Sequence, residues 1–193
     1  GFVNIGKETT LTVPGPSADV SCGIAIGHFQ YPLQSMVKEA QSAEKRAKGK
    51  YNRGAMAVSL LKRGGEIIHW GAKWDSPAWM LYDEYLKLSN SEEVSGKFPN
   101  AIAQLLAPYQ LEKEAGEASI SCDDLKEIIE EDFWHVVKQQ GGNATLTKLQ
   151  KDGFEDVVTA YLNELQGETK ESKRFEDFAN LFLTAAFIHR DRE

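Results

Sequence analysis

The spacing of apolar residues changes abruptly at Asp75-Ser76-Pro77, and this change constrains the fold more than any other feature of the sequence. Before it, short continuous apolar runs typical of strands cover 19–26, 55–61 and 66–70. After it, apolar residues recur every three or four positions, which predicts helices at about 78–89, 97–109, 122–140, 143–166 and 173–189. We therefore predict an α+β protein in which a partial sheet is followed by an all-helical domain.

Length and composition agree with one domain of ordinary size or two small ones. The chain has 193 residues, of which 41% are hydrophobic and 26% are charged. Residues 1–18 are rich in Gly, Thr, Pro and Ser, so we interpret them as a connector, with 19–76 as the sheet-containing unit and 77–193 as a helical bundle. No apolar run reaches the roughly 20 residues that cross a bilayer, and the N-terminus lacks the pattern of a signal peptide. The expected location is the cytoplasm.

The pattern of the first expected strand indicates that the sheet is incomplete. Residues 19–26 form a continuous apolar run with small residues, which is typical of a central strand buried on both faces. The helix expected at 31–48 opens near Pro32 and has one apolar stripe that lies on the sheet: Leu33, Met36, Val37, Ala40, Ala43 and Ala47. A hairpin follows, with its turn at Gly64-Gly65. These elements leave the central strand without a neighbour on one side, so either another chain completes the sheet or the sequence is part of a longer protein.

Basic residues gather between positions 38 and 63, where eight Lys and Arg accompany only two acidic residues. Residues 1–80 contain 10 basic and 6 acidic side chains, whereas 81–193 contain 12 and 23, so the two parts differ strongly in charge. Lys45 and Lys48 are three positions apart and share one side of a helix end, and Arg53 follows a turn that contains glycine. Two ammonium groups and a guanidinium in this arrangement could bracket a triphosphate. On composition alone, a solvated helix face is the favoured interpretation.

Other polar and aromatic positions allow two interpretations each. Ser21-Cys22-Gly23 places a hydroxyl and a position without a side chain on a central strand, where a nucleotide could approach the backbone, but a strand glycine is also a packing device. The aromatic residues near the boundary form either a base-stacking platform or, as we favour, the core between the two units: Trp70, Trp74, Trp79 and Tyr82. The histidines and cysteines lack metal-ligand spacing, and no phosphate-loop or nucleophile motif occurs. We therefore assign no catalytic and no metal-binding residue to this chain.

The order of motifs in 20–58 resembles that of one protein family. The motifs are Val20-Ser21-Cys22-Gly23-Ile24-Ala25-Ile26-Gly27-His28-Phe29, then Tyr31-Pro32-Leu33, then Glu39-Ala40 with Ala43-Glu44-Lys45 and Ala47-Lys48, then Asn52-Arg53 with Ala55-Met56-Ala57-Val58. They resemble the C-terminal part of the large, polymerase/cyclase-like subunit of type III CRISPR effector complexes, of the Cmr (III-B) kind. The helical remainder is similar to that subunit's C-terminal domain, so the resemblance covers about residues 17–193.

The resemblance implies a fold and a site. The family has ferredoxin-like palm domains, so residues 19–76 would be the C-terminal part of a palm. The family's Gly-Gly-Asp-Asp hairpin, which holds the metal ions used to join ATP into cyclic oligoadenylates, would precede residue 1. Ser21 and Gly23 match the family's Ser-x-Gly strand beside the nucleotide. Lys45 and Lys48 match lysines that face the triphosphate, and Arg53 corresponds only loosely. The implied cofactors are ATP and Mg²⁺, with metal ligands outside this chain.

The resemblance also implies partners and an activity. The expected partners are the missing N-terminal part of the same subunit, other effector subunits including a small helical one, and guide and target RNA through the complex, with no membrane. One function is part of a nucleotidyltransferase that target RNA activates and that is inactive alone because the metal site is absent. The other is a non-catalytic scaffold whose acidic bundle docks small helical subunits. A diguanylate-cyclase relative is a third interpretation, but the helical bundle argues against it. The chain is either a fragment or one piece of a split subunit.

Overall fold

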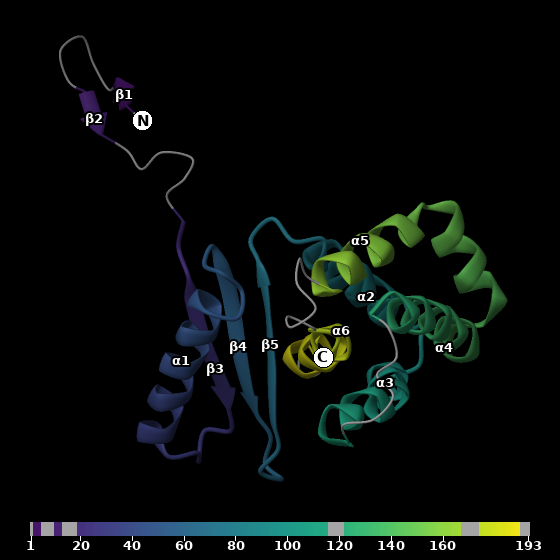
Figure 1. Ribbon diagram of the computed structural model, residues 1–193, viewed down its shortest axis with the longest axis horizontal. Coiled ribbons are helices and arrows are strands. Elements are labelled where there is room, and N and C mark those ends of the chain that lie inside the picture. Colours follow the sequence, from purple (N-terminus) through teal and green to yellow (C-terminus); the bar gives the residue numbers. More distant parts are fainter. Residues whose placement is uncertain (1, 5–9, 13–18, 116–121, 167–173, 190–193) are drawn as a thin grey trace.

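The computed structural model describes residues 2–4, 10–12, 19–115, 122–166 and 174–189 (Figure 1). Two short strands, β1 (Phe2–Asn4) and β2 (Thr10–Thr12), pair antiparallel within the stretch expected to be a connector. In Figure 1 this hairpin lies apart from the rest of the protein. The pairing of β1 with β2 therefore forms a small sheet of its own and does not extend the main sheet.

The main sheet has three strands, β3 (Cys22–Gly27), β4 (Ala55–Leu61) and β5 (Ile67–Lys73), in this spatial order. β3 and β4 are parallel and are joined by helix α1 (Leu33–Lys48), because parallel strands need a crossover connection. β4 and β5 form the predicted hairpin, in which the Lys62 amide donates to the Glu66 carbonyl at 2.9 Å. Gly65 supplies the positive φ of +87° in its turn. The predicted α+β class, a partial sheet followed by helices, is confirmed.

Small residues bring α1 close to the sheet. Alternate positions of β3, at 23, 25 and 27, are Gly, Ala and Gly, and they lie on the face that α1 covers. On the helix, Ala43 and Ala47 are completely buried and pack with small residues of β4. The approach is tightest at Gly23, where a Cβ atom would lie 2.1 Å from the backbone nitrogen of Glu44. No side chain fits between β3 and α1 at this point.

The opposite face of the sheet packs on the helical part of the chain. The helices described after the sheet are α2 (Ala78–Asn90), α3 (Phe98–Ala115), α4 (Cys122–Lys151), α5 (Phe154–Gln166) and α6 (Glu176–His189). α6 lies beside β5 and also packs on α2 and α3 (Figure 1). Val58 and Trp70 of the sheet join Phe133, Phe178 and Phe182 of the helices in one continuous core. None of the helices in the described segments has the length and apolar character needed to cross a membrane.

The prediction of a single helix at 143–166 is wrong. Residues up to 151 belong to α4, and Gly153, with a φ of +72°, separates α4 from α5. α4 itself is kinked at Gly142, whose φ of 80° and ψ of 178° are not helical. The predicted helix end near 140 corresponds to this kink. Both breaks occur at glycines because glycine adopts positive φ without steric cost, and apolar residues recur on both sides of each break.

β3 is an edge strand within the described residues. It pairs with β4 alone, so β4, and not the strand expected at 19–26, is the central strand of the sheet. The predicted apolar stripe of α1 is also only partly buried, since Leu33 is 78% exposed and Val37 is 49% exposed. Leu33 and Val37 lie on the same side of α1 as Ala40 and Glu44, the two residues that contact Gly23. They therefore lie over β3 and its outer edge. The sheet does not extend far enough to cover them.

Candidate functional site

The candidate residues that the sequence predicts lie at one end of the sheet, the upper end in Figure 1. β3 and β4 are parallel, so both begin at this end, and α1, which connects them, ends there. Ser21 directly precedes β3, and Lys45 and Lys48 lie in the last turn of α1. Arg53 lies two residues before β4. We refer to Lys45, Lys48 and Arg53 as the basic cluster.

The two lysines of the basic cluster are exposed to solvent. Lys48 Nζ lies 2.6 Å from Glu44 Oε1, an ion pair between exposed side chains that contributes less than about 1 kcal/mol. Lys45 forms no ion pair with any residue that the structure describes. Because Glu44 marks the point where α1 touches Gly23, Lys48, one helix turn later, lies on the flank of α1 that borders β3. Lys45 directly follows Glu44 and lies about 100° further round the helix, away from the buried face. The Lys48 ammonium group is therefore available to an anion that approaches the outer side of β3, and Lys45 is available from the solvent side of α1.

Hydrogen bonds fix the turn that contains Arg53. Three consecutive residues of this turn have positive φ, at +53°, +62° and +56° for Asn52, Arg53 and Gly54. The Arg53 amide donates to the Ala47 carbonyl at 3.0 Å, and the Trp74 amide donates to the Gly54 carbonyl, also at 3.0 Å. The Trp74 indole donates to the Val20 carbonyl at 2.6 Å. These bonds join the segments before β3 and β4 to the end of β5.

Gly23 has a packing role in this structure. The space that a side chain would occupy is filled by the backbone of α1 at Ala40 and Glu44. A nucleotide therefore cannot reach Gly23 from the α1 side, and the opposite face of β3 packs on the helical part through Ile24. The outer edge of β3 is the remaining approach, and the half-buried Ser21 lies at its start. Nucleotide binding by Ser21 and Gly23 stays a prediction, and it applies to this edge.

Arg46 lies on the other flank of α1 and belongs to a polar cluster that sequence reasoning missed. Its Nη2 donates to Ser59 Oγ at 2.6 Å, and its Nη1 donates to Ser42 Oγ at 3.2 Å. The Ser59 hydroxyl donates to Glu39 Oε2 at 3.3 Å and lies 3.4 Å from His69 Nδ1. Burial lowers the pKa of Arg46, and burial together with the charge of Arg46 lowers the pKa of His69. The signal that could have revealed this cluster is Ser59, a hydroxyl in the middle of an apolar strand.

A second group that sequence reasoning missed joins the turn after α1 to α6. Asp177, in the first turn of α6, is completely buried, and its Oδ1 lies 3.1 Å from Lys50 Nζ. Its Oδ2 accepts a hydrogen bond of 3.0 Å from the Tyr51 hydroxyl. Burial raises the pKa of Asp177 to about 6, although the charge of Lys50 acts in the opposite direction. We refer to Lys50, Tyr51 and Asp177 as the Asp177 anchor. In sequence, Asp177 resembles any acidic residue at a helix start, so no local signal distinguishes it.

The aromatic residues near the boundary divide between core and surface. Trp70 is buried, its indole donates to the Tyr161 hydroxyl at 3.3 Å, and its ring stacks on Tyr82. Trp74 is 46% exposed and stacks on Trp79. The favoured interpretation as core therefore holds for Trp70, whereas Trp74 lies on the surface.

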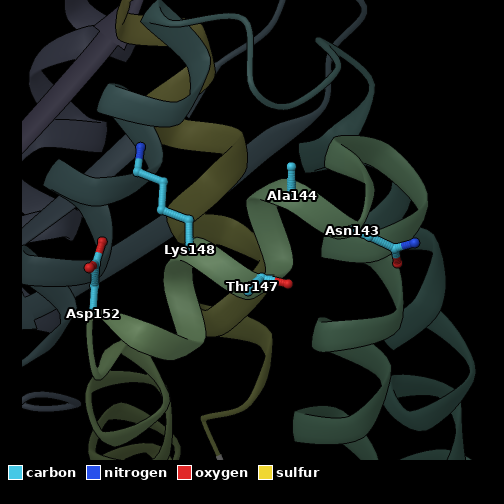
Figure 2. Close-up of a pocket in the computed structure, with 5 residues that line it drawn as sticks. All are labelled: Asn143, Ala144, Thr147, Lys148 and Asp152. Carbon is cyan, nitrogen blue, oxygen red and sulfur yellow. The ribbon is translucent and has the colours of Figure 1, made fainter.

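A surface hollow of about 540 Å³ lies on the last part of α4 (Figure 2). Its lining residues are Asn143, Ala144, Thr147, Lys148 and Asp152. Lys148 Nζ lies 2.8 Å from Glu93 Oε1, and this hydrogen-bonded pair lowers the pKa of Glu93 and raises that of Lys148. In Figure 2, Asn143 points away from the Lys148 side chain. The polar groups of the hollow therefore do not converge on one point, and α4, which lines it, lies on the other side of the sheet from α1 in Figure 1.

No three His, Cys, Asp or Glu side chains of the described segments come together in a way that could hold a metal ion. Comparison of the chain with protein-family models, with curated proteins and with solved structures gives no match.

Proposed function

We propose that this chain is a portion of the large subunit of a type III CRISPR RNA-guided effector complex and contributes ATP-binding residues to cyclic oligoadenylate synthesis. The proposal depends on one observation, the placement of the basic cluster and Ser21 at one end of the sheet, where the outer edge of β3 pairs with no described strand. The motif order in 20–58 agrees with it. In this proposal the complex acts in the cytoplasm and binds guide and target RNA.

The basic cluster would bind and orient the triphosphate of ATP. Its two ammonium groups and one guanidinium offset the charge of the phosphates and hold the α-phosphate in line with an attacking hydroxyl. When bound, Mg²⁺ supplies charge neutralisation at the phosphates and at the leaving pyrophosphate. The ligands of Mg²⁺ would come from outside this chain. The chain alone is therefore expected to bind ATP weakly and not to join it.

The open edge of β3 supports a site shared with another segment. The outer backbone groups of β3 have no strand partner among the described residues, and such an edge is a template for pairing. A strand that paired there would cover Leu33 and Val37, which are now exposed, and would run beside the flank of α1 that contains Lys48. In this proposal the strand belongs to the missing N-terminal part of the same subunit.

A reconstituted effector complex with the double variant Lys45→Ala/Lys48→Ala tests the proposal. We expect the rate of cyclic oligoadenylate synthesis to fall about a hundredfold, while complex assembly and guide-directed RNA binding stay unchanged. Lys38→Ala is the matched control, because it removes an exposed lysine from the first half of the same helix. Unchanged synthesis in the double variant, or an equal loss with Lys38→Ala, would contradict triphosphate binding by the basic cluster.

The purified chain provides a second test. Incubated with ATP and Mg²⁺, it should produce no cyclic oligoadenylate, because two-metal phosphoryl transfer needs a preorganised set of carboxylates and the described residues contain no group of three potential metal ligands. Product formation by the chain alone would show that our placement of the catalytic carboxylates outside it is wrong.

The alternative proposal is a scaffold that docks a small helical subunit. The net negative charge of residues 81–193 favours it, as does a group of exposed acidic positions near the start of α4: Asp123, Asp124, Glu127 and Glu131. Neutralising Glu127 and Glu131 to Gln should weaken docking of a basic helical partner in pull-down assays at low salt, and added salt should weaken wild-type docking in the same way. Docking that is insensitive to both changes would contradict this alternative.

A further inference from the structure

The turn after α1 is attached to the helical part of the chain at one buried point, the Asp177 anchor. Tyr51 and Asp177 are 126 positions apart in sequence, yet the Tyr51 hydroxyl lies 3.0 Å from Asp177 Oδ2. Lys50 Nζ lies 3.1 Å from Asp177 Oδ1, and the Asp177 side chain is 0% exposed. Hydrogen bonds to an ionised group are shorter and stronger than neutral ones. Two such bonds from neighbouring residues fix the turn relative to α6.

Neighbouring elements enclose the anchor. The Tyr161 hydroxyl of α5 donates to the Asp177 carbonyl at 3.4 Å. The Arg174 guanidinium lies 5.4 Å from the centre of the Tyr51 ring. The same ring covers Gly71 of β5, where a Cβ atom would lie 2.6 Å from it. The turn, β5, α5 and α6 therefore meet at this one side-chain group.

The backbone of the turn requires such an attachment. Asn52 and Arg53 have positive φ, which is unfavourable for residues with a Cβ atom. Backbone of this kind persists only where the surrounding structure holds it. Tyr51 directly precedes these two residues, and Lys48 lies three positions before Tyr51. The Tyr51 and Arg53 amides donate to the carbonyls of Arg46 and Ala47, so the turn is also bonded to the last turn of α1, which contains Lys48. The anchor therefore bears on the positions of both Arg53 and Lys48.

We propose that Asp177 is a positioning residue for the basic cluster and acts through Lys50 and Tyr51 to hold Lys48 and Arg53 in the arrangement that binds phosphate. The inference rests on the proposed function only for its effect on phosphate binding, because the anchor itself is established by the contacts above. Asp177 belongs to α6, so a subunit that docks on the helical part and shifts the start of α6 also shifts the basic cluster. The anchor is thus a physical connection between a docking surface and the nucleotide site.

Protonation of Asp177 should weaken the anchor. The charged and titratable groups around it are Lys50 and Tyr51 of the turn, Arg46 of α1, Tyr161 of α5, and Arg174 and Glu176 at the start of α6, with His69 of β5 beside Lys50 and Glu176. Burial raises the pKa of Asp177 to about 6. The contacts with Lys50 and Tyr51 lower the pKa of Asp177 against the larger effect of burial, so protonation below this pH weakens these two contacts and should loosen the turn locally. Burial has the opposite effect on the whole fold, because the folded state binds the proton more tightly than the unfolded chain.

Amide hydrogen exchange of the full chain, followed by NMR, tests the anchor with Asp177→Asn. The amides of Tyr51 and Arg53 donate to the carbonyls of Arg46 and Ala47, so their exchange reports opening of the turn. We expect both to exchange about tenfold faster in the variant, the factor that corresponds to losing one hydrogen bond to a charged group. The matched control, Asp156→Asn, removes an exposed carboxylate from the first turn of α5 and should leave both rates unchanged.

A pH titration distinguishes positioning from a merely structural role. The Tyr51 amide resonance of the wild-type protein should titrate with a midpoint near pH 6, the pKa expected for buried Asp177. The titration should survive His69→Gln and vanish in Asp177→Asn. If Asp177→Asn does not fold, Tyr51→Phe is the substitute, because it removes one of the two hydrogen bonds and keeps the ring. We expect the Tyr51 and Arg53 amides to exchange faster in this variant too, by a smaller factor. A folded Asp177→Asn protein with wild-type exchange and an unchanged titration would overturn the anchor.

Binding of inorganic triphosphate, measured by calorimetry, tests the consequence for the basic cluster. We expect weaker binding by Asp177→Asn than by wild type and by Asp156→Asn. A loosened turn with unchanged triphosphate affinity would refute the positioning role. If the wild-type chain and the reconstituted complex both fail to bind triphosphate, the proposed function fails and the positioning role with it, while the exchange measurements still decide whether the anchor exists.

Discussion

Replacing Gly23 with Ala is the smallest change that tests how α1 lies on the sheet. The added methyl group would lie 2.1 Å from the Glu44 nitrogen, 2.4 Å from the Ala40 carbonyl oxygen and 2.7 Å from the Glu44 Cα. All three are backbone atoms within a helix, so no side chain can rotate away. Because ordinary contacts begin near 3.4 Å, α1 would have to move by more than 1 Å.

The magnitude follows from this geometry. Forcing an extra methyl group into a packed interior costs about 1–3 kcal/mol, and we expect the upper end because only backbone atoms are available to move. For a chain of this length, about 3 kcal/mol corresponds to a decrease in Tm of roughly 6–12 °C. Backbone strain adds nothing, because Gly23 does not have a positive φ.

Urea unfolding followed by far-ultraviolet circular dichroism measures the loss. Gly64→Ala is the matched control, since no atom lies within 4 Å of the position that its Cβ would take. We expect the control to change the free energy of unfolding by less than about 0.5 kcal/mol. A Gly23→Ala protein as stable as wild type would refute the close packing of α1, and equal losses in both variants would show that the contact with α1 is not the cause.

Three further predictions concern the aromatic core, the buried carboxylate and the open edge. Phe182→Ala should lower the free energy of unfolding by about 3–5 kcal/mol in urea, because this buried ring contacts several others; a loss below about 1 kcal/mol would contradict its place in the core. The pKa of Asp177 is raised from 3.8 to about 6 on folding, so the folded state binds that proton more tightly than the unfolded chain. Wild-type stability should therefore fall by up to about 3 kcal/mol, relative to Asp177→Asn, as pH rises from about 4 to 6; parallel pH profiles of the two proteins would count against this. Val37→Lys should change the stability of the chain alone by less than about 0.5 kcal/mol, because the side chain already meets solvent at the edge of β3; a large loss would show that this edge is covered.

The parts of the fold that depend on local pattern could be predicted from the sequence. The turn at Gly64-Gly65 and the strands on either side of it are determined by residues close together in the chain, and the structure has the hairpin there. The helix at 31–48 was predicted within two residues of α1. The break at Gly153 was missed, because periodicity reports which residues are apolar and does not report where a glycine adopts a left-handed conformation.

In the candidate site, too, the sequence predicts what depends on neighbouring residues and misses what depends on tertiary packing. Lys45 and Lys48 could be placed together because one helix turn relates them, and Arg53 follows within a few residues. Asp177 could not be assigned, since its partners Lys50 and Tyr51 are distant in sequence and a buried carboxylate is defined by tertiary packing. Nucleotide binding by Lys45, Lys48 and Arg53 stays a prediction.

The two faces of the sheet bury side chains of very different size. On the α1 side the buried hydrophobic cluster consists of four alanines and Tyr51, whereas the other side packs against many aromatic and leucine side chains. Hydrophobic stabilisation grows by about 0.8 kcal/mol for each buried methylene, so the α1 layer is stabilised far less than the helical core. α1 and β3 should therefore form the least stable cooperative unit, one that detaches and re-forms while the β4–β5 hairpin and the helices remain folded. Detachment would expose the edge of β4 that now pairs with β3. The contacts of Lys50 and Tyr51 with Asp177 would remain, and α1 and β3 would pack back onto the sheet from that point.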